Sequence, residues 1–117
     1  LKHGKFWIAL RADPAWKEVE FTARWPDIEG HVPDTSECAE IFWTHDVADV
    51  RRADYVLVYA LPAEKLRGTL VEVGVALGLG KSVVVVGQHP DFGTWQHHPL
   101  VKRVDSLDEA LRFITGP

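Results

Sequence analysis

Glu72 is the carboxylate whose position is most typical of chemistry. It follows an apolar segment at residues 55–60 and a short loop, and it lies near the start of a predicted helix. The positive end of a helix keeps such a carboxylate ionised. An ionised, partly desolvated carboxylate can attack an anomeric carbon. The spacing also fits a structural motif, because Thr69-x-x-Glu72 matches a capping box in which Glu72 binds the Thr69 amide.

Asp46 is a second carboxylate in an unusual place, because it falls on the apolar face of a helix predicted from residues 34–36 to about Arg52. The apolar residues of that face are Ala39, Phe42, Trp43, Val47 and Val50. A charge among them needs a partner or a change of protonation state. Asp46 is therefore either a proton-handling group or the acceptor of a structural hydrogen bond to a loop amide. Asp49 and Asp54 are expected nearer the solvated side of this helix and its end.

The elements that would position these groups alternate between strands and helices. Segment 5–11 fits a helix or a short strand, and its apolar spacing favours a helix. The remaining predicted strands are 19–25, 55–60, 82–86 and 102–104. The remaining predicted helices are about 35–52, then 69–79, and a last one that begins at Ser106-x-x-Glu109. Gly80 directly follows the end of the second of these helices. This alternation predicts an α/β fold, a three-layer sandwich around a parallel sheet. Ligands of such sheets bind at the carboxyl ends of the strands, here the loops after Trp25, Ala60 and Val86.

Composition excludes several classes of function. The 117 residues, 46% hydrophobic and 26% charged, predict one globular domain over 1–117, and no apolar run is long enough to span a membrane. A net charge of −4 gives no basic surface for a nucleic acid polymer. The lone Cys38 and the lack of a secretory signal favour a cytoplasmic protein. His89, His97 and His98 lack the spacing of a metal site. The glycine-rich motifs that bind phosphate are missing from the sequence, and no cofactor is expected.

Three segments carry a family resemblance. Residues 52–59, 68–76 and 80–83 together resemble the nucleoside 2-deoxyribosyltransferase family, which includes related 2′-deoxynucleoside 5′-phosphate N-hydrolases. The resemblance implies a flavodoxin-like sandwich with strand order 2-1-3-4-5 and a homodimer or higher homo-oligomer. It also implies that Glu72 is the nucleophile, that Asp46 lies near the base and the sugar, and that Gly68 and Thr69 line the sugar. Gly74 and Gly78, four residues apart on one helix, would allow close approach of the sheet or of a second subunit.

The sequence departs from the family pattern in two places. Leu66-Arg67 replaces the acidic residue that usually holds the sugar 5′-hydroxyl. Arg67 suits a 5′-phosphate, because a guanidinium offers a bidentate fork for that group, although it could equally be a solvated loop residue. The glycine-rich turn after strand one is reduced to residues 2–4, so we expect strand one upstream of Leu1 and His3 in the substrate site. Trp25, at a predicted strand end, is the other expected substrate contact.

These observations predict an enzyme that cleaves or transfers the N-glycosidic bond of a (deoxy)nucleoside or its 5′-monophosphate. Glu72 would attack C1′, and Asp46 would assist proton transfer at the leaving base. Two alternatives remain open at this point. One is a binding or sensing module that keeps the nucleotide pocket without turnover. The other is a phosphoribohydrolase of the lysine-decarboxylase-like type, whose glycine-rich signature is half met by Gly68-Thr69-x-x-Glu72.

Overall fold

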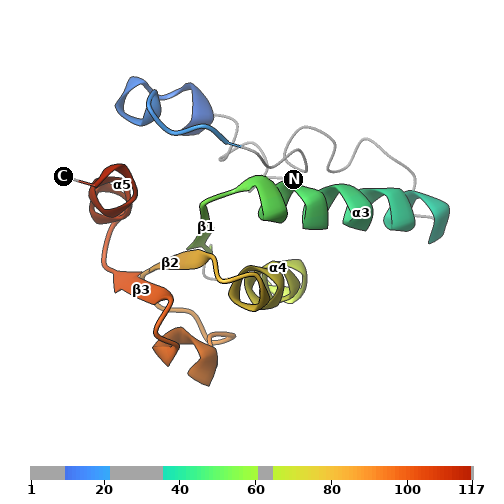
Figure 1. Ribbon diagram of the computed structural model, residues 1–117. Helices are drawn as coiled ribbons and strands as arrows, with labels where there is room; N and C mark the ends of the chain where they lie inside the picture. Colours follow the sequence, from blue (N-terminus) through green and yellow to red (C-terminus); the bar gives the residue numbers. More distant parts are fainter. Residues whose placement is uncertain (1–9, 22–35, 61–64, 117) are drawn as a thin grey trace. The chain divides into compact units, whose positions relative to one another are not determined.

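The computed structural model describes residues 10–21, 36–60 and 65–116 (Figure 1). The chain divides into two compact units, Leu1–Arg52 and Ala53–Pro117. Each unit is described by itself below. Within the described ranges, none of the helices combines the length and the apolar character that crossing a membrane requires.

The second unit is built on a parallel sheet. Its strands are β1 (Tyr55–Tyr59), β2 (Ser82–Val86) and β3 (Val101–Val104), in the order β1-β2-β3. Leu57 of β1 pairs with Val84 of β2, which pairs with Lys102 of β3. The α/β class and these three predicted strands are confirmed. Their order matches the last three strands of the expected 2-1-3-4-5 arrangement.

β2 is the centre of the core. Its valines Val83 to Val86 are all buried, and residues that point to opposite faces of a strand are buried together only where both faces are covered. Helix α4 (Arg67–Gly78) contacts β1 and β2, whereas α5 (Leu107–Thr115) contacts β2 and β3. Figure 1 shows the two helices on opposite sides of the strands. The second unit therefore has the three layers that the sequence predicted.

The end of α4 and the start of α5 have the conformations that the sequence predicts. At the end of α4, Gly80 has φ +74°, its N–H donates to the Leu77 carbonyl, and the Lys81 N–H donates to the Ala76 carbonyl. This Schellman motif needs the left-handed conformation that glycine adopts without steric cost. At the start of α5, the Ser106 hydroxyl accepts a hydrogen bond from the Glu109 N–H at 3.2 Å. The predicted cap of the last helix is confirmed.

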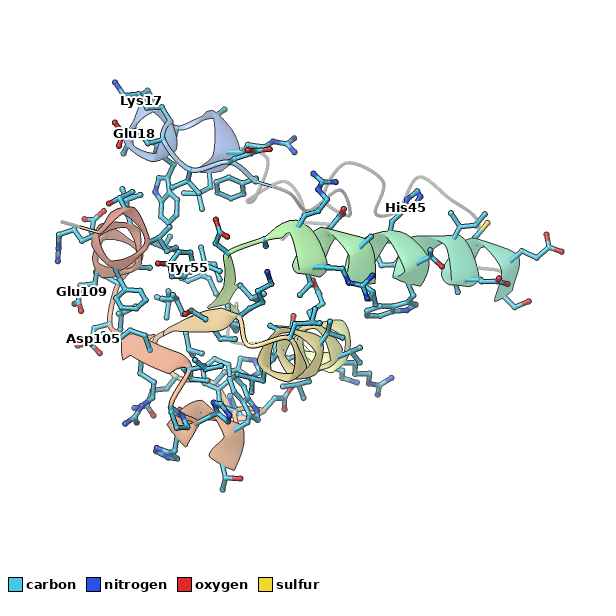
Figure 2. All side chains as sticks on the ribbon, viewed as in Figure 1. Lys17, Glu18, His45, Tyr55, Asp105 and Glu109 are labelled. Atoms are coloured by element: carbon cyan, nitrogen blue, oxygen red, sulfur yellow. The ribbon has the colours of Figure 1, made fainter. Side chains whose placement is uncertain are left out.

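An aromatic contact joins α5 to the far strand of the sheet. Tyr55 lies on the side of β1 that faces α5, and its ring meets Phe113 edge to face at 5.9 Å between centroids (Figure 2). Lys102 of β3 places its ammonium 5.9 Å from the centre of the same Phe113 ring. These contacts connect the helix to both outer strands of the described sheet, and so hold α5 across its face.

Most of the described residues of the first unit are helical. Residues 10–12 are helical, the 3-10 helix η1 spans Pro14–Trp16, and α3 spans Ser36–Arg52. The Asp13 carboxylate caps η1 by accepting from the Ala15 N–H at 2.9 Å, and Trp16 is buried with Phe21 at its edge. Residues 19–21 do not form the strand predicted over 19–25, and residues 22–25 lie outside the described residues.

Truncation of Val84 should test the central role of β2. Val84→Ala removes two buried methyl groups and should lower the free energy of unfolding by about 2 kcal/mol or more, because the tightly packed sheet cannot collapse onto the cavity. Ile41→Ala is the control, since Ile41 is 60% exposed on α3. Urea denaturation should show a change within about 0.5 kcal/mol for the control. Equal effects of the two variants would contradict the assignment of β2 as the core.

Candidate active site

The start of α4 carries four of the predicted site residues. Arg67, Gly68 and Thr69 form its first turn, and Glu72 follows one turn later with a half-buried side chain. Gly68 and Thr69 precede Glu72 by four and three residues, the spacings that place residues on one helix face. Arg67 precedes Glu72 by five residues, about 140° around the helix, and is exposed. The helix therefore groups Gly68, Thr69 and Glu72, and it directs Arg67 elsewhere.

The capping box predicted at Thr69-x-x-Glu72 is wrong. The helix begins at Arg67 with Leu66 as its N-cap, so Thr69 is its third residue and Glu72 its sixth. A capping box requires its threonine at the N-cap position. The sequence favours Thr69 as the N-cap because threonine is a common capping residue and leucine is not. The helix instead begins two residues before Thr69, after the apolar Leu66. Capping therefore does not explain the position of Glu72.

Asp91, which is not among the residues predicted for the site, accepts one of the N–H groups that the start of α4 leaves without a partner inside the helix. Its Oδ2 accepts a hydrogen bond from the Leu66 N–H at 3.2 Å, while Leu66 makes no side-chain cap of its own. Asp91 belongs to the loop after β2, and α4 begins after β1. In a parallel sheet these two loops lie at the same edge. The cap was missed because it joins residues that lie 25 positions apart, and no local motif encodes it.

His89 holds Asp91 in this position. The Asp91 N–H donates to His89 Nδ1 at 3.0 Å, and the same nitrogen lies 3.9 Å from the Asp91 Oδ2. An Nδ1 that accepts a hydrogen bond leaves the proton of the neutral ring on Nε2. The His89 side chain is only 3% exposed and packs on Phe92, whose ring meets Trp95. The buried imidazole thus orients the loop that caps α4.

In the first unit, two buried carboxylates lie on one face of α3. Asp46 is 4% exposed and Asp49 is 3% exposed, and they share the face with the buried Val50. The predicted burial of Asp46 is confirmed. The expectation that Asp49 lies nearer the solvent is wrong, because it falls one turn after Asp46 on the buried side, where the exposed Arg52 reaches it with Nη1 at 3.6 Å from Oδ1. Ala39, predicted on the same face, is exposed.

An open hollow runs along a different side of α3. It is lined by Glu40, Trp43, Thr44, Val47, Ala48 and Arg51. Asp46 and Asp49 are not among the residues that line it. Because the described residues that line this hollow all come from one helix, we do not assign the active site to it.

The glycines of α4 do not serve contact with the described sheet. A Cβ atom added at Gly74 or at Gly78 would meet no heavy atom within 4 Å. Close approach to the three described strands, part of one of the two explanations offered by the sequence, is therefore excluded. Close approach of a second subunit remains a prediction.

The remaining predicted site residues are placed as follows. Asp46 lies in the first unit, and Arg67, Gly68, Thr69 and Glu72 lie in the second. His3 and Trp25 lie outside the described residues. Among the residues that the structure does describe, no three His, Cys, Asp or Glu side chains gather as a metal site would require.

Parallel strands, a helix that starts at their carboxyl ends and a glutamate on that helix define an α/β protein with a candidate active site at the sheet edge. The family model described as nucleoside 2-deoxyribosyltransferase matches residues 12–99, well over half of the chain. The chain therefore belongs to the nucleoside 2-deoxyribosyltransferase family, and this membership supports a transferase or glycosidase. No curated protein and no solved structure gives a match.

Removal of the Asp91 carboxylate should weaken the start of α4. Asp91→Ala leaves the Leu66 N–H without its acceptor and should lower the free energy of unfolding by about 1 kcal/mol, the usual value of a helix cap. Asp91→Asn keeps an acceptor oxygen and should cost less. Asp105→Ala is the control, because Asp105 is an exposed carboxylate that follows β3 at the same sheet edge (Figure 2). Chemical denaturation that ranks Asp105→Ala equal to Asp91→Ala would contradict the cap.

Proposed function

We propose that the protein cleaves the N-glycosidic bond of a (deoxy)nucleoside or its 5′-monophosphate, with Glu72 as the nucleophile. The observation that carries the proposal is the position of Glu72 itself. It is a half-buried carboxylate on the helix that starts at the carboxyl edge of the sheet, inside the segment matched by the family, and the capping box does not account for it. Gly68 and Thr69, one turn earlier on the same face, leave room for a sugar beside it.

The proposed reaction has two displacements at C1′. A Glu72 carboxylate oxygen forms a bond to C1′ while the C1′–N bond breaks, and the base leaves with the bonding electron pair. The base takes up a proton, and Asp46 is the proposed group for that transfer. Water or a second base then attacks C1′ and releases Glu72, which completes hydrolysis or transfer. A covalent intermediate divides one difficult step into two easier ones.

The family match also favours this chemistry over the phosphoribohydrolase alternative. Incubation with a panel of deoxynucleosides and their monophosphates, with and without an acceptor base, tests the proposal directly. Chromatography would detect free base for hydrolysis and a new nucleoside for transfer. A chain that binds these compounds but releases no base from any of them is a binding module.

We further propose a homo-oligomer, whose subunits would meet over the exposed Val71, Gly74 and Gly78 of α4.

Glu72→Gln should abolish base release, because an amide cannot form the glycosyl ester. Gln has a helix propensity close to that of Glu, so the variant should lose at most about 1 kcal/mol of stability. Intact-protein mass spectrometry during turnover should detect a deoxyribosyl adduct on the wild type and none on Glu72→Gln. Glu37→Gln, an exposed glutamate in the first turn of α3, is the control. Full activity of Glu72→Gln would reject the proposed nucleophile.

Asp46→Asn should reduce turnover by about 10²–10⁴-fold, the range for loss of a positioned acid or base. Asp49→Asn is the matched control, because Asp49 is equally buried one turn further along the same helix. Thermal denaturation of both variants separates chemistry from folding. A structural role for Asp46 would appear as a lower melting temperature in Asp46→Asn with full turnover by the folded fraction.

A further inference from the structure

His89 is a buried titratable group that the proposed reaction does not use. Its side chain is 3% exposed, its Nδ1 accepts the Asp91 N–H at 3.0 Å, and its buried Nε2 has no hydrogen-bond partner among the residues that the structure describes. We propose that His89, Asp91 and Leu66 form a pH-sensitive latch. The neutral His89 ring holds the loop after β2 to the start of α4, and protonation of the ring releases that loop.

The closed latch requires a neutral ring. Histidine is the side chain that ordinarily changes its charge between about pH 5 and pH 8. An Nδ1 that accepts the Asp91 N–H must keep a free electron pair, so the single ring proton is on Nε2. With its backbone fixed in this way, Asp91 presents Oδ2 to the Leu66 N–H at 3.2 Å. The neutral imidazole therefore connects the loop to α4 through Asp91.

Protonation acts on both bonds of the closed latch at once. The added proton turns the acceptor of the Asp91 N–H into a donor, and two N–H groups that face each other repel. The same Nδ1 lies 3.9 Å from Asp91 Oδ2, the oxygen that accepts from Leu66. A charged Nδ1–H attracts a carboxylate oxygen more strongly than a neutral amide does. The imidazolium therefore competes with the Leu66 N–H for Oδ2.

Burial prevents the ring from avoiding this conflict where it stands. The imidazole packs on Phe92, whose own ring meets Trp95 edge to face. A charged ring in this place would keep an Nε2–H without a described acceptor, and a buried charge without hydrogen bonds is costly. The charged ring reaches water only when the loop moves. Protonation is thereby coupled to the position of the loop.

The Asp91 carboxylate is the ion-pair partner that the structure gives the His89 ring. Glu72 lies six residues after Leu66, about 9 Å further along the axis of α4. Solvent screens the other charges of the adjoining segments, because their side chains are exposed: Lys65, Arg67, Lys102, Arg103 and Asp105. Asp91 is therefore the group expected to respond to the charge of His89.

His98 provides an internal comparison in the same connection between β2 and β3. Its Nδ1 accepts the Leu100 N–H at 3.0 Å, the same bond that His89 makes to the residue two positions further on. His98 is exposed, and Leu100 offers no carboxylate where Asp91 does. Protonation of His98 should therefore break one local bond and move nothing at the start of α4.

Nuclear magnetic resonance of the wild type between about pH 8 and pH 5 tests the latch without any substrate. The ring nitrogen signals of His89 should show the proton on Nε2 at the upper pH and on both nitrogens at the lower one. The amide protons of Asp91 and Leu66 should move upfield in the same transition, whereas Leu100 should follow the His98 ring. Asp91 and Leu66 amides that stay in place while His89 titrates would overturn the proposal. A His89 ring that stays neutral to pH 5 would also overturn it.

His89→Asn separates the acceptor from the titration. An asparagine side chain can accept the N–H two residues further on, as in an Asx turn, but it takes up no proton in this range. The Leu66 amide should then keep its neutral-pH position down to about pH 5, and the matched control His98→Asn should respond to pH as the wild type does. A Leu66 response that persists in His89→Asn would contradict the latch. Should His89→Asn fail to fold, the wild-type titration decides the question.

Discussion

The burial of β2 on both faces is the constraint on which the second unit depends. A strand covered on both sides cannot present functional side chains from its own faces, so polar groups must come from the segments that follow the strand ends. Glu72 on α4 and the His89–Asp91 segment after β2 both obey this rule. The same valines that exclude water from the sheet thus restrict the chemistry of this unit to the edge where its strands end.

The hydrogen bond between Asp91 and Leu66 shows how that edge is held together. The Leu66 side chain is buried in the core, so its position as the N-cap is set by packing, and a leucine offers no oxygen to its own helix. The N–H of Leu66 itself finds its acceptor in Asp91, on the loop after the neighbouring strand, and that loop is held in turn by an imidazole packed on Phe92. Core packing at one residue therefore creates the need for a polar contact with a distant one. This contact gives the start of α4 a negative charge that its own sequence does not contain.

Local patterns predicted the parts of this structure that local forces determine. The all-valine run of β2, the Gly80 end of α4 and the Ser106 cap of α5 are each encoded within a few residues, and each prediction was confirmed. The cap of α4 was predicted wrongly because a threonine at the right distance from Glu72 imitates a capping box. Asp91 could not have been found in this way, because nothing local distinguishes it from any loop aspartate. Asp49 was misplaced because a charged residue was assumed to face solvent, although it lies three positions after Asp46 on the same face.

The roles of the two proposed catalytic carboxylates follow from their different surroundings. Glu72 is half-buried near a helix start whose positive potential is shared with Asp91, and an ionised carboxylate with partial access is suited to attack a carbon. Asp46 is almost completely buried, on the same face of α3 as the buried Asp49. The accessible carboxylate on α4 is therefore better suited to be the proposed nucleophile than the buried one on α3.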